Sequence, residues 1–375
     1  MSRLLDEKRA AGAPLIDLTE SNPTRAGIAY PTERITSALA DARSAQYQPA
    51  PRGLAEARNA VVSYYAERGR TVDPERLLLT ASTSEAYAWL FKLLADPGDE
   101  LLAPHPSYPL FDFLAALESV KLAPYPLCFD GAWHIDFPSL RRAITPRTRA
   151  LLLVNPNNPT GSFVKHEELE TLVELAVEHD LAIISDEVFS DYAFASDAKR
   201  VETLIEERRA LVFCLSGLSK VVGLPQLKLG WIHVGGPEIL AAQANARLEL
   251  IADTYLSVGA PVQHAAAKLL ALRSTVGGAI ATRVAESHRT IARCVRDTAV
   301  ELLATEGGWY ATLRLPGTRS DEAWALDLLA SDNVIAQPGY FFDFPLADRA
   351  YLVISLLTPP ELLDEGVRRI IARAA

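Results

Sequence analysis

An alternation of short apolar runs with longer amphipathic stretches limits the folds that are open to this chain. The segments 85–95 and 166–179 have helical spacing, and acidic residues occupy the first turns of the second. Continuous apolar strands separated by helices predict an α/β fold, with a mainly parallel sheet covered on both faces. The strand-length runs, bounded by charge, glycine or proline, cover residues 76–80, 100–103, 149–154, 181–185, 211–215 and 230–234.

The pattern changes after Gly236. Residues 237–305 are rich in alanine, leucine and arginine and are predicted to be largely helical, and strand-like and helix-like segments alternate beyond Trp309. A chain of 375 residues is long for one domain. We expect a large α/β domain over residues 46–255 and a smaller α+β domain formed by residues 1–45 and 256–375.

Composition excludes several classes of function. The net charge is -10 and lysine and arginine form no block, which argues against a nucleic-acid or anionic-membrane partner. No apolar run approaches the roughly 18 residues of a membrane helix, and no signal-peptide core is present, so a cytoplasmic protein is expected. The three cysteines form no CxxC pair, so neither a disulfide framework nor a metal site is predicted.

Lys220 is the main candidate for covalent chemistry. It ends the string Ser216-Gly-Leu-Ser-Lys220 that follows an apolar strand, at the sheet edge where α/β enzymes place ligands. A desolvated, neutral amine there could form a Schiff base with an aldehyde. An isolated SxxSK string would favour an ordinary surface lysine, and only the neighbouring motifs reverse that preference.

Asp186 ends another apolar strand, in the string IISDEVF. A carboxylate at that place needs a cationic or hydrogen-bonding partner, and a protonated pyridine nitrogen would supply one. A helix N-cap is an equally good interpretation of Asp186 alone. Asn158 lies in Asn155-Pro-Asn-Asn-Pro-Thr-Gly161, where two prolines and a glycine fix the backbone and leave amides free to reach a phenolic oxygen; an ordinary turn is the alternative.

Two further segments could complete a binding site. Ser82, Thr83 and Ser84 stand at the start of a predicted helix, where backbone N–H groups and hydroxyls can bind a phosphate, although such residues usually only cap. Tyr108, held between prolines in PHPSYP, could stack on a ring or simply pack in the core.

Taken in order, the strings STS, PSYP, NPNNPTG, SDEVF, SGLSK and KLGW resemble those of the class I/II aminotransferases of fold type I, from about Ile16 to the last helix. The resemblance implies pyridoxal 5'-phosphate as cofactor and a seven-stranded sheet in the large domain. It also implies a small domain built from both termini, and a homodimer with active sites at the interface.

The resemblance also implies residue roles. Lys220 would be the Schiff-base lysine and proton shuttle, Asp186 the partner of the pyridinium nitrogen, and Asn158 a contact of the ring oxygen. Tyr108 would stack on the ring. The phosphate contacts would be Ser82, Thr83, Ser84, Ser219 and, from the neighbouring subunit, Tyr47.

Three positions depart from the family pattern. Phe189 replaces a tyrosine that hydrogen-bonds the ring oxygen, and Lys228 replaces the phosphate-binding arginine, keeping its charge without the bidentate fork. Val353 stands where an arginine clamps the substrate α-carboxylate. Either the substrate has no α-carboxylate or another cation binds it, and Arg25, in the loop that begins at Ser21, is the candidate replacement.

These observations predict an aminotransferase that carries an amino group, as pyridoxamine phosphate, from an amino acid or amine to a 2-oxo acid. A lyase or cyclising synthase on the same scaffold is the alternative, because the carboxylate region is altered. The effector domain of a transcription regulator is disfavoured, because the resemblance begins by Ile16 and leaves no room for a winged helix.

Overall fold

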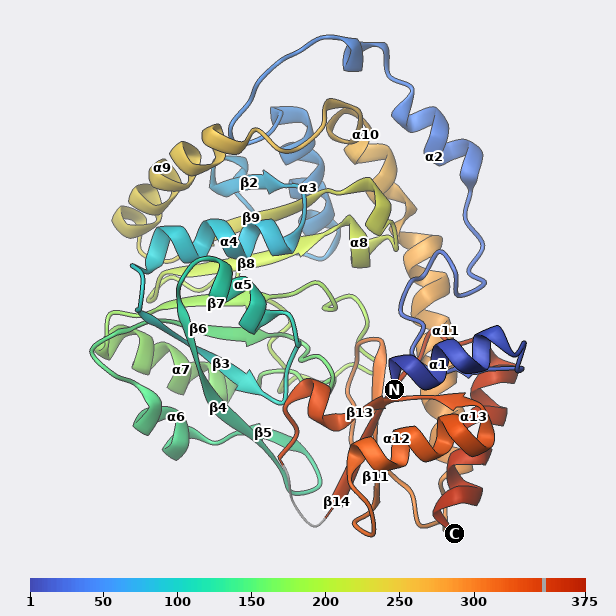
Figure 1. Cartoon of the computed structure of the whole chain (residues 1–375). Helices are drawn as coiled ribbons and strands as arrows, with labels where there is room; N and C mark the ends of the chain where they lie inside the picture. Colours follow the sequence, from blue (N-terminus) through green and yellow to red (C-terminus); the bar gives the residue numbers. More distant parts are fainter. Residues whose placement is uncertain (346–348) are drawn as a thin grey trace.

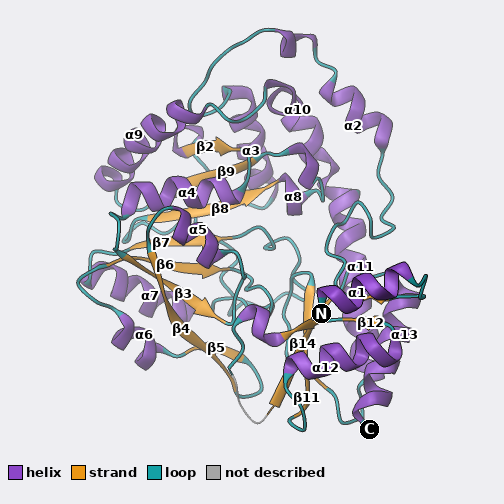
Figure 2. Cartoon of the chain, in the orientation of Figure 1, coloured by secondary structure: helices purple, strands orange, loops and turns teal. Residues whose placement is uncertain are grey.

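The computed structural model describes residues 1–345 and 349–375, and it contains two main β-sheets with helices packed on them (Figure 1). The larger sheet is drawn in cyan to yellow-green, and the smaller one lies near the C-terminus in orange and red. Helices lie on both sides of the larger sheet (Figure 2). The predicted α/β fold is therefore confirmed.

The larger sheet has eight strands, and its central strands β8, β7, β6, β3 and β4 are parallel to their neighbours within that group. The outer strands β2, β9 and β5 run antiparallel to the strands they pair with. In spatial order the strands are β2 (Leu77–Thr80), β9 (Gly230–Gly235), β8 (Val212–Gly217), β7 (Ala182–Asp186), β6 (Thr148–Val154), β3 (Glu100–His105), β4 (Lys121–Phe129) and β5 (Trp133–Ile135).

The expected number of seven strands is wrong by one. The short strand β5 pairs antiparallel with the end of β4 and adds the eighth position. No apolar run in the sequence indicates β4 either, because it carries Pro124 and Pro126 and leaves much of its surface half-buried. Proline lacks the N–H that a strand interior donates, so such a segment does not have the pattern of a strand.

Alternate residues of the larger sheet enter two different cores, as the two-residue period of a strand requires. Leu151 and Leu153 of β6 pack into the core on one face, and Leu152 and Val154 into the core on the other. The first core takes in α3 (Ala55–Glu67), α6 (Phe137–Ala143), α7 (His166–Glu178) and α10 (Ala260–Leu270); the second takes in α4 (Thr83–Leu94), α5 (Phe111–Leu117) and α9 (Glu238–Tyr255).

The smaller sheet is antiparallel and lies beside helices from the last third of the chain. Its strands, in spatial order, are β10 (Glu301–Leu302), β11 (Tyr310–Pro316), β14 (Arg349–Ser355) and β13 (Gln337–Pro338). The helices of this region are α11 (Val276–Cys294), α12 (Asp321–Asp327) and α13 (Pro360–Ala374), with a π-helical turn over Leu328–Asp332.

The N-terminal segment joins both regions. It begins with α1 (Ser2–Ala10), and β1 (Ile16–Asp17) then pairs in parallel with β12 (Val334–Ile335), beside α13. In contrast, α2 (Thr32–Leu39) lies next to α10. The domain boundaries at residues 45 and 255 therefore stay a prediction. None of the helices that the structure describes is long and apolar enough to cross a membrane.

Candidate active site

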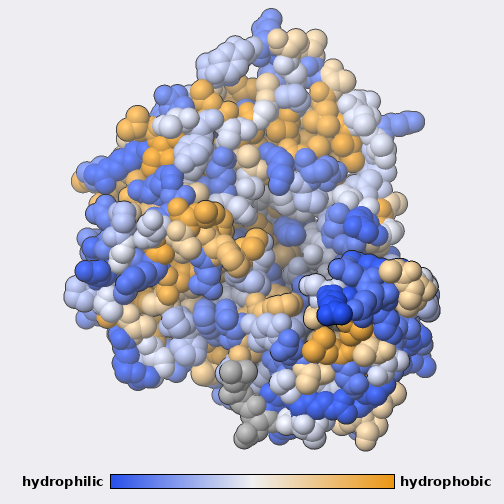
Figure 3. Space-filling view, in the orientation of Figure 1, coloured by the Kyte–Doolittle hydropathy of each residue, from blue (hydrophilic) through white to orange (hydrophobic). Residues whose placement is uncertain are grey.

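A cavity of about 360 Å³ lies at the carboxyl ends of β6, β7 and β8, where the smaller sheet faces the larger one. The surface is visibly hollowed between these two regions (Figure 3). Ligands of α/β proteins bind at this edge of the sheet. The lining residues are Ser21, Ser82, Thr83, Tyr108, Pro109, Leu110, Phe111, Val154, Asn158, Asp186, Val188, Phe189, Gly217, Ser219, Lys220, Leu229, Gly230, Tyr310, Gln337 and Phe342.

Lys220 lies in the cavity because the short helix α8 (Leu218–Val221) begins directly after β8. Its Nζ lies 4.6 Å from the centroid of the Trp309 ring and 5.5 Å from that of Phe189. Burial lowers the pKa of Lys220 to about 8, and the opposing effect of Asp186 is smaller. The amine is therefore substantially neutral near pH 8, the state in which it is a nucleophile.

Asp186 is the last residue of β7 and is buried in the same cavity. Its Oδ2 accepts a hydrogen bond of 2.8 Å from the Tyr87 hydroxyl, and its Oδ1 accepts one of 3.1 Å from the Val188 N–H. Burial nevertheless raises the pKa of Asp186 to about 6, against the lowering effect of these two bonds. A cation placed against this carboxylate would favour its charged form.

Asn158 follows β6 and turns a buried amide toward the cavity. Its Oδ1 has no hydrogen-bond partner among the described residues. Since the two ends of an amide exchange by a flip of the side chain, Asn158 can offer an N–H to an oxygen acceptor. In the neighbouring Asn155, both ends of the side-chain amide are hydrogen-bonded to backbone groups. Its Nδ2 donates to the Val201 carbonyl, and its Oδ1 accepts from the Val164 N–H.

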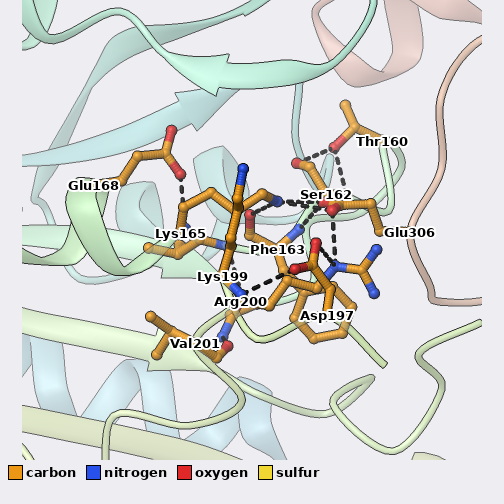
Figure 4. Close-up of polar contacts among 12 residues, drawn as sticks. Thr160, Ser162, Phe163, Lys165, Glu168, Asp197, Lys199, Arg200, Val201 and Glu306 are labelled. Carbon is orange, nitrogen blue, oxygen red and sulfur yellow. Dashed lines mark hydrogen bonds and ion pairs between the residues drawn. The ribbon is translucent and has the colours of Figure 1, made fainter. Parts of the chain in front are cut away.

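The loop that carries Asn158 is anchored to the segment before β11 by Glu306 (Figure 4). The Glu306 carboxylate accepts hydrogen bonds from Lys165 Nζ at 2.6 and 2.8 Å, and from Arg200 Nε at 2.8 Å. Gly161 lies against this segment with φ +69°, and a Cβ there would come within 2.4 Å of the Gly307 carbonyl oxygen. Glycine is thus required for the close approach.

The start of α4 forms one end of the cavity. The Ser82 hydroxyl caps the helix by accepting a 3.2 Å hydrogen bond from the Glu85 N–H, and Thr83 lies in its first turn. Both residues line the cavity, together with Ser219 beside the lysine. Ser84 is half-buried and is not among the lining residues. Hydroxyls and free N–H groups at a helix start favour an anion.

Tyr108 lies at the cavity wall with its ring edge-on to Phe111, 5.5 Å between centroids. Burial raises the pKa of Tyr108 to about 12, so the phenol stays neutral. Phe189 also lines the cavity, and its ring is edge-on to that of Trp309. Aromatic rings thus line a space that holds few charged groups.

The family model for aminotransferases of class I and II matches residues 13–370. This chain belongs to the class I and II aminotransferases. The glutamate-pyruvate aminotransferase of Escherichia coli K12 is 30% identical over 351 residues, 91% of this chain and 86% of that protein. The alanine aminotransferase of Mycobacterium tuberculosis H37Rv is 30% identical over 362 residues, 92% and 82% of the two chains.

Solved structures agree with these relatives. The alanine aminotransferase from Pyrococcus furiosus superimposes with a TM-score of 0.88 at 25% identity, covering 100% of this chain and 95% of that one. An Escherichia coli aminotransferase gives a TM-score of 0.85 at 26% identity, covering 98% and 93%. The predicted activity, transfer of an amino group from an amino donor to a 2-oxo acid, is confirmed.

Class I and II aminotransferases depend on pyridoxal phosphate, and the cavity of this aminotransferase fits that group. A neutral amine, a carboxylate without an ion pair among the described residues, an unpaired amide and a helix start surround one space. They match the aldehyde, ring nitrogen, phenolic oxygen and phosphate of the cofactor in chemical type. The described residues include no cluster of side chains that could hold a metal ion.

Besides Ser84, three residues predicted for this aminotransferase lie outside the cavity lining. Lys228 is exposed, with φ 54°, just after a short 3-10 helix. Tyr47 is 83% exposed in the segment between α2 and α3. The side chain of Arg25 is 75% exposed and lies 3.4 Å from Glu20, whereas Ser21 of the same loop does line the cavity.

Other residues that line the cavity, or that contact Lys220 or Asp186 from behind it, are not indicated by the motifs. Trp309 and Tyr310 follow a Gly-Gly pair, which is a usable turn signal, and Gln337 and Phe342 flank the string Pro338-Gly339. Tyr87 lies one helical turn after Thr83, so its position on the same face of α4 follows from spacing. Motif strings alone offer no reason to choose these side chains.

Proposed function

We propose that this aminotransferase holds pyridoxal 5'-phosphate in the cavity at the carboxyl ends of β6, β7 and β8, with Lys220 bound to its aldehyde carbon. The observation that supports this most directly is a buried lysine, with a pKa of about 8, that shares a cavity with the buried Asp186 carboxylate. When bound, the cofactor supplies an electron-withdrawing ring that acidifies the Cα proton of an attached amine.

Each residue then has a distinct role. With the cofactor bound, Lys220 would be the base that takes up and gives back the substrate Cα proton. Asp186, held by Tyr87, would favour a protonated ring nitrogen. Asn158 would donate to the ring oxygen, and Tyr108 would lie against the ring. Because Phe189 has no hydroxyl, Asn158 bears more of the contact with that oxygen.

The phosphate would lie at the start of α4, against Ser82, Thr83, Ser84 and Ser219. Lys228 and Tyr47 are further proposed contacts of the phosphate. Lys228 would supply a positive charge near it, and Tyr47 would reach it from the second subunit of a homodimer. The exposed position of Tyr47, outside its own cavity, is compatible with that role. A cytoplasmic location, the domain boundaries and the lack of nucleic-acid or membrane partners stay predictions.

The test is the absorption spectrum of the purified holoenzyme during addition of single amino compounds, then of 2-oxo acids, in wild type and Lys220→Ala. Wild type should convert to the amine form of the cofactor and be restored by an oxo acid. Lys220→Ala should slow this conversion by a factor of about 10²–10⁴, because the base is gone. Lys121→Ala, an exposed lysine, is the control.

Two results would contradict the proposal. Release of ammonia or a cyclic product without the amine form would assign a lyase or synthase reaction to the altered carboxylate region. Full activity of Lys220→Ala would exclude this lysine from the reaction.

A further inference from the structure

We propose that the cavity wall formed by Tyr310 of β11 and Gln337 of β13 binds an uncharged hydrogen-bonding group of the amino substrate, and that Gln337 recognises that group. The preferred substrates are then amino compounds with an amide, alcohol or carbonyl beside the amine, rather than α-amino acids. This inference rests on the proposed function and specifies the substrate class of that site.

The wall is defined by strand register. Val353 of β14 lies directly opposite Thr312 of β11 on one side and Gln337 of β13 on the other. Residues opposite each other in neighbouring strands present their side chains on the same face. Tyr310, two residues before Thr312, shares that face. Because both Tyr310 and Gln337 line the cavity, this face of the smaller sheet is the one that meets the substrate.

Val353 lies between Thr312 and Gln337 in the sheet but does not itself line the cavity, so the layer directly behind the wall is apolar. It is fully buried and packs in a cluster with Trp133, Leu303, Phe342 and Phe344. A valine offers neither charge nor hydrogen bond, and the aromatic side chains around it bring no charge. An anionic group pressed against this part of the wall would lose its hydration without compensation.

Polar atoms without a hydrogen-bond partner lie on either side of Val353 in the sheet. The Oε1 atom of Gln337 is buried and has no hydrogen-bond partner among the described residues, and the same holds for Oγ1 of Thr312. Buried polar atoms are normally paired, and Gln337, unlike Thr312, lines the cavity, so its unpaired amide oxygen indicates a group kept for a ligand. An amide can accept from a hydroxyl or donate to a carbonyl, according to its orientation.

Charge argues against a carboxylate here. Among the described lining residues Lys220 is the single cation, and in the proposed function it is either bound to the cofactor or serves as the base for the Cα proton. Arg25 extends into solvent beside Glu20. A 2-oxo acid can still enter, but its carboxylate would rely on neutral donors, so the expected preference is a difference in relative affinity.

Binding can be measured separately from turnover with three amines that lack an α-hydrogen: 2-amino-2-methylpropanoic acid, its primary amide and the corresponding amino alcohol. Without an α-hydrogen they cannot be transaminated, so the absorbance change of the holoenzyme reports equilibrium binding. Comparing Kd ratios between variant and wild type cancels the different basicities of the amines.

In wild type, the amide and the alcohol should bind about tenfold or more tightly than the acid, calculated for the free amine. Gln337→Met, which keeps the length and removes the amide, should weaken the amide and the alcohol by about tenfold and the acid by less than about threefold. Gln243→Met, an exposed glutamine of α9, should change none of them. Val353→Arg should reverse the preference toward the acid.

The outcomes that overturn the inference are specific. The inference is overturned if the wild-type holoenzyme binds the acid more tightly than the amide, or if it binds none of the three compounds. It is also overturned if Gln337→Met changes the Kd of all three compounds by the same factor. If Arg25→Ala binds the acid more weakly than wild type does, Arg25 binds the substrate carboxylate, and the inference is overturned as well. If Val353→Arg does not fold, Gln337→Met decides alone. Failure of transamination with α-hydrogen donors would leave these dissociation constants intact, so the two proposals fail separately.

Discussion

Lys220 and Asp186 lie in one cavity, and its low polarity affects the two residues in opposite directions. Burial lowers the pKa of the lysine to about 8 and raises the pKa of the aspartate to about 6, because each charged form loses water. Both residues are thus close to changing protonation near neutral pH. Groups that give and take protons in catalysis are tuned in this way.

The lowered pKa of Lys220 gives a pH prediction. A depressed pKa means that the ammonium loses its proton at lower pH, so the reactive neutral amine accumulates as the pH rises through about 8 rather than 10.5. The rate at which cofactor-free protein combines with pyridoxal phosphate should rise with that midpoint, followed by absorbance. Asp186→Asn should move the midpoint lower, because Asp186 favours the charged lysine. A wild-type midpoint near 10.5 would contradict the assignment.

Tyr87 gives a second prediction at this scale. Its hydroxyl donates to the buried Asp186 carboxylate at 2.8 Å, so Tyr87→Phe should lower the free energy of unfolding by about 1.5–3 kcal/mol, the usual size for a bond to a charged group. Urea unfolding at neutral pH measures it. Tyr125→Phe removes a neutral bond to the Leu152 carbonyl and should cost only about 0.5–1.5 kcal/mol. Equal losses in the two variants would argue against a special role for Tyr87.

At the scale of elements, the site is built from segments that follow parallel strands. The residues that follow β6, β7 and β8 lie next to one another, because these parallel strands are neighbours in the sheet. They bring Asn158, Asp186 and Lys220 to one edge although up to 62 positions (220 − 158) separate them. The loop after β6 is further held by Glu306, which accepts from both Lys165 and Arg200.

Glu306→Ala should therefore destabilise the loop that carries Asn158. Removal of the carboxylate leaves Lys165 without its ion-pair partner and Arg200 with Asp197 alone, and we expect a loss of about 1–3 kcal/mol in the free energy of unfolding. The affinity for pyridoxal phosphate should fall as well. Glu301→Ala breaks the more exposed pair with Arg314 and should cost at most about 1 kcal/mol. A stable Glu306→Ala variant with unchanged cofactor affinity would show that the loop holds its shape alone.

At the scale of the whole molecule, the active site is proposed to need two chains. Within one chain Tyr47 lies outside the cavity, exposed between α2 and α3. A subunit that gives its tyrosine to a partner receives one in return, because the interface of a two-fold dimer repeats itself. The homodimer and the role of Tyr47 can be tested together.

Subunit mixing supplies that test. Tyr47→Ala and Lys220→Ala should each have low activity alone. In an equal mixture refolded together, mixed dimers contain one site with both native residues, so about one quarter of wild-type sites should return. Activity at saturating cofactor measures it, and the Lys220→Ala protein mixed with itself is the control. No recovery, with mixed dimers shown to form, would place Tyr47 outside the partner's site.

Much of the fold can be predicted because its signals are local. Buried parallel strands are continuous apolar runs, and the runs at residues 76–80, 100–103, 149–154, 181–185, 211–215 and 230–234 all correspond to strands of the larger sheet. Two strands lack such a signal: β4 is interrupted by prolines, and β5 has only three residues. Lys220, Asp186 and Asn158 were predictable because each follows or ends a strand of the parallel sheet, where ligands bind in α/β proteins. Side chains from other parts of the chain cannot be predicted in this way.

Residue order and short-range spacing are enough to establish the fold class, the family and the chemical groups at the centre of the site. Which distant side chains meet depends instead on tertiary packing. The strand register that places Gln337 beside Val353 and Thr312, and the burial that shifts the pKa values of Lys220 and Asp186, result from contacts between segments far apart in the chain. Such contacts follow from three-dimensional packing, which no local pattern encodes.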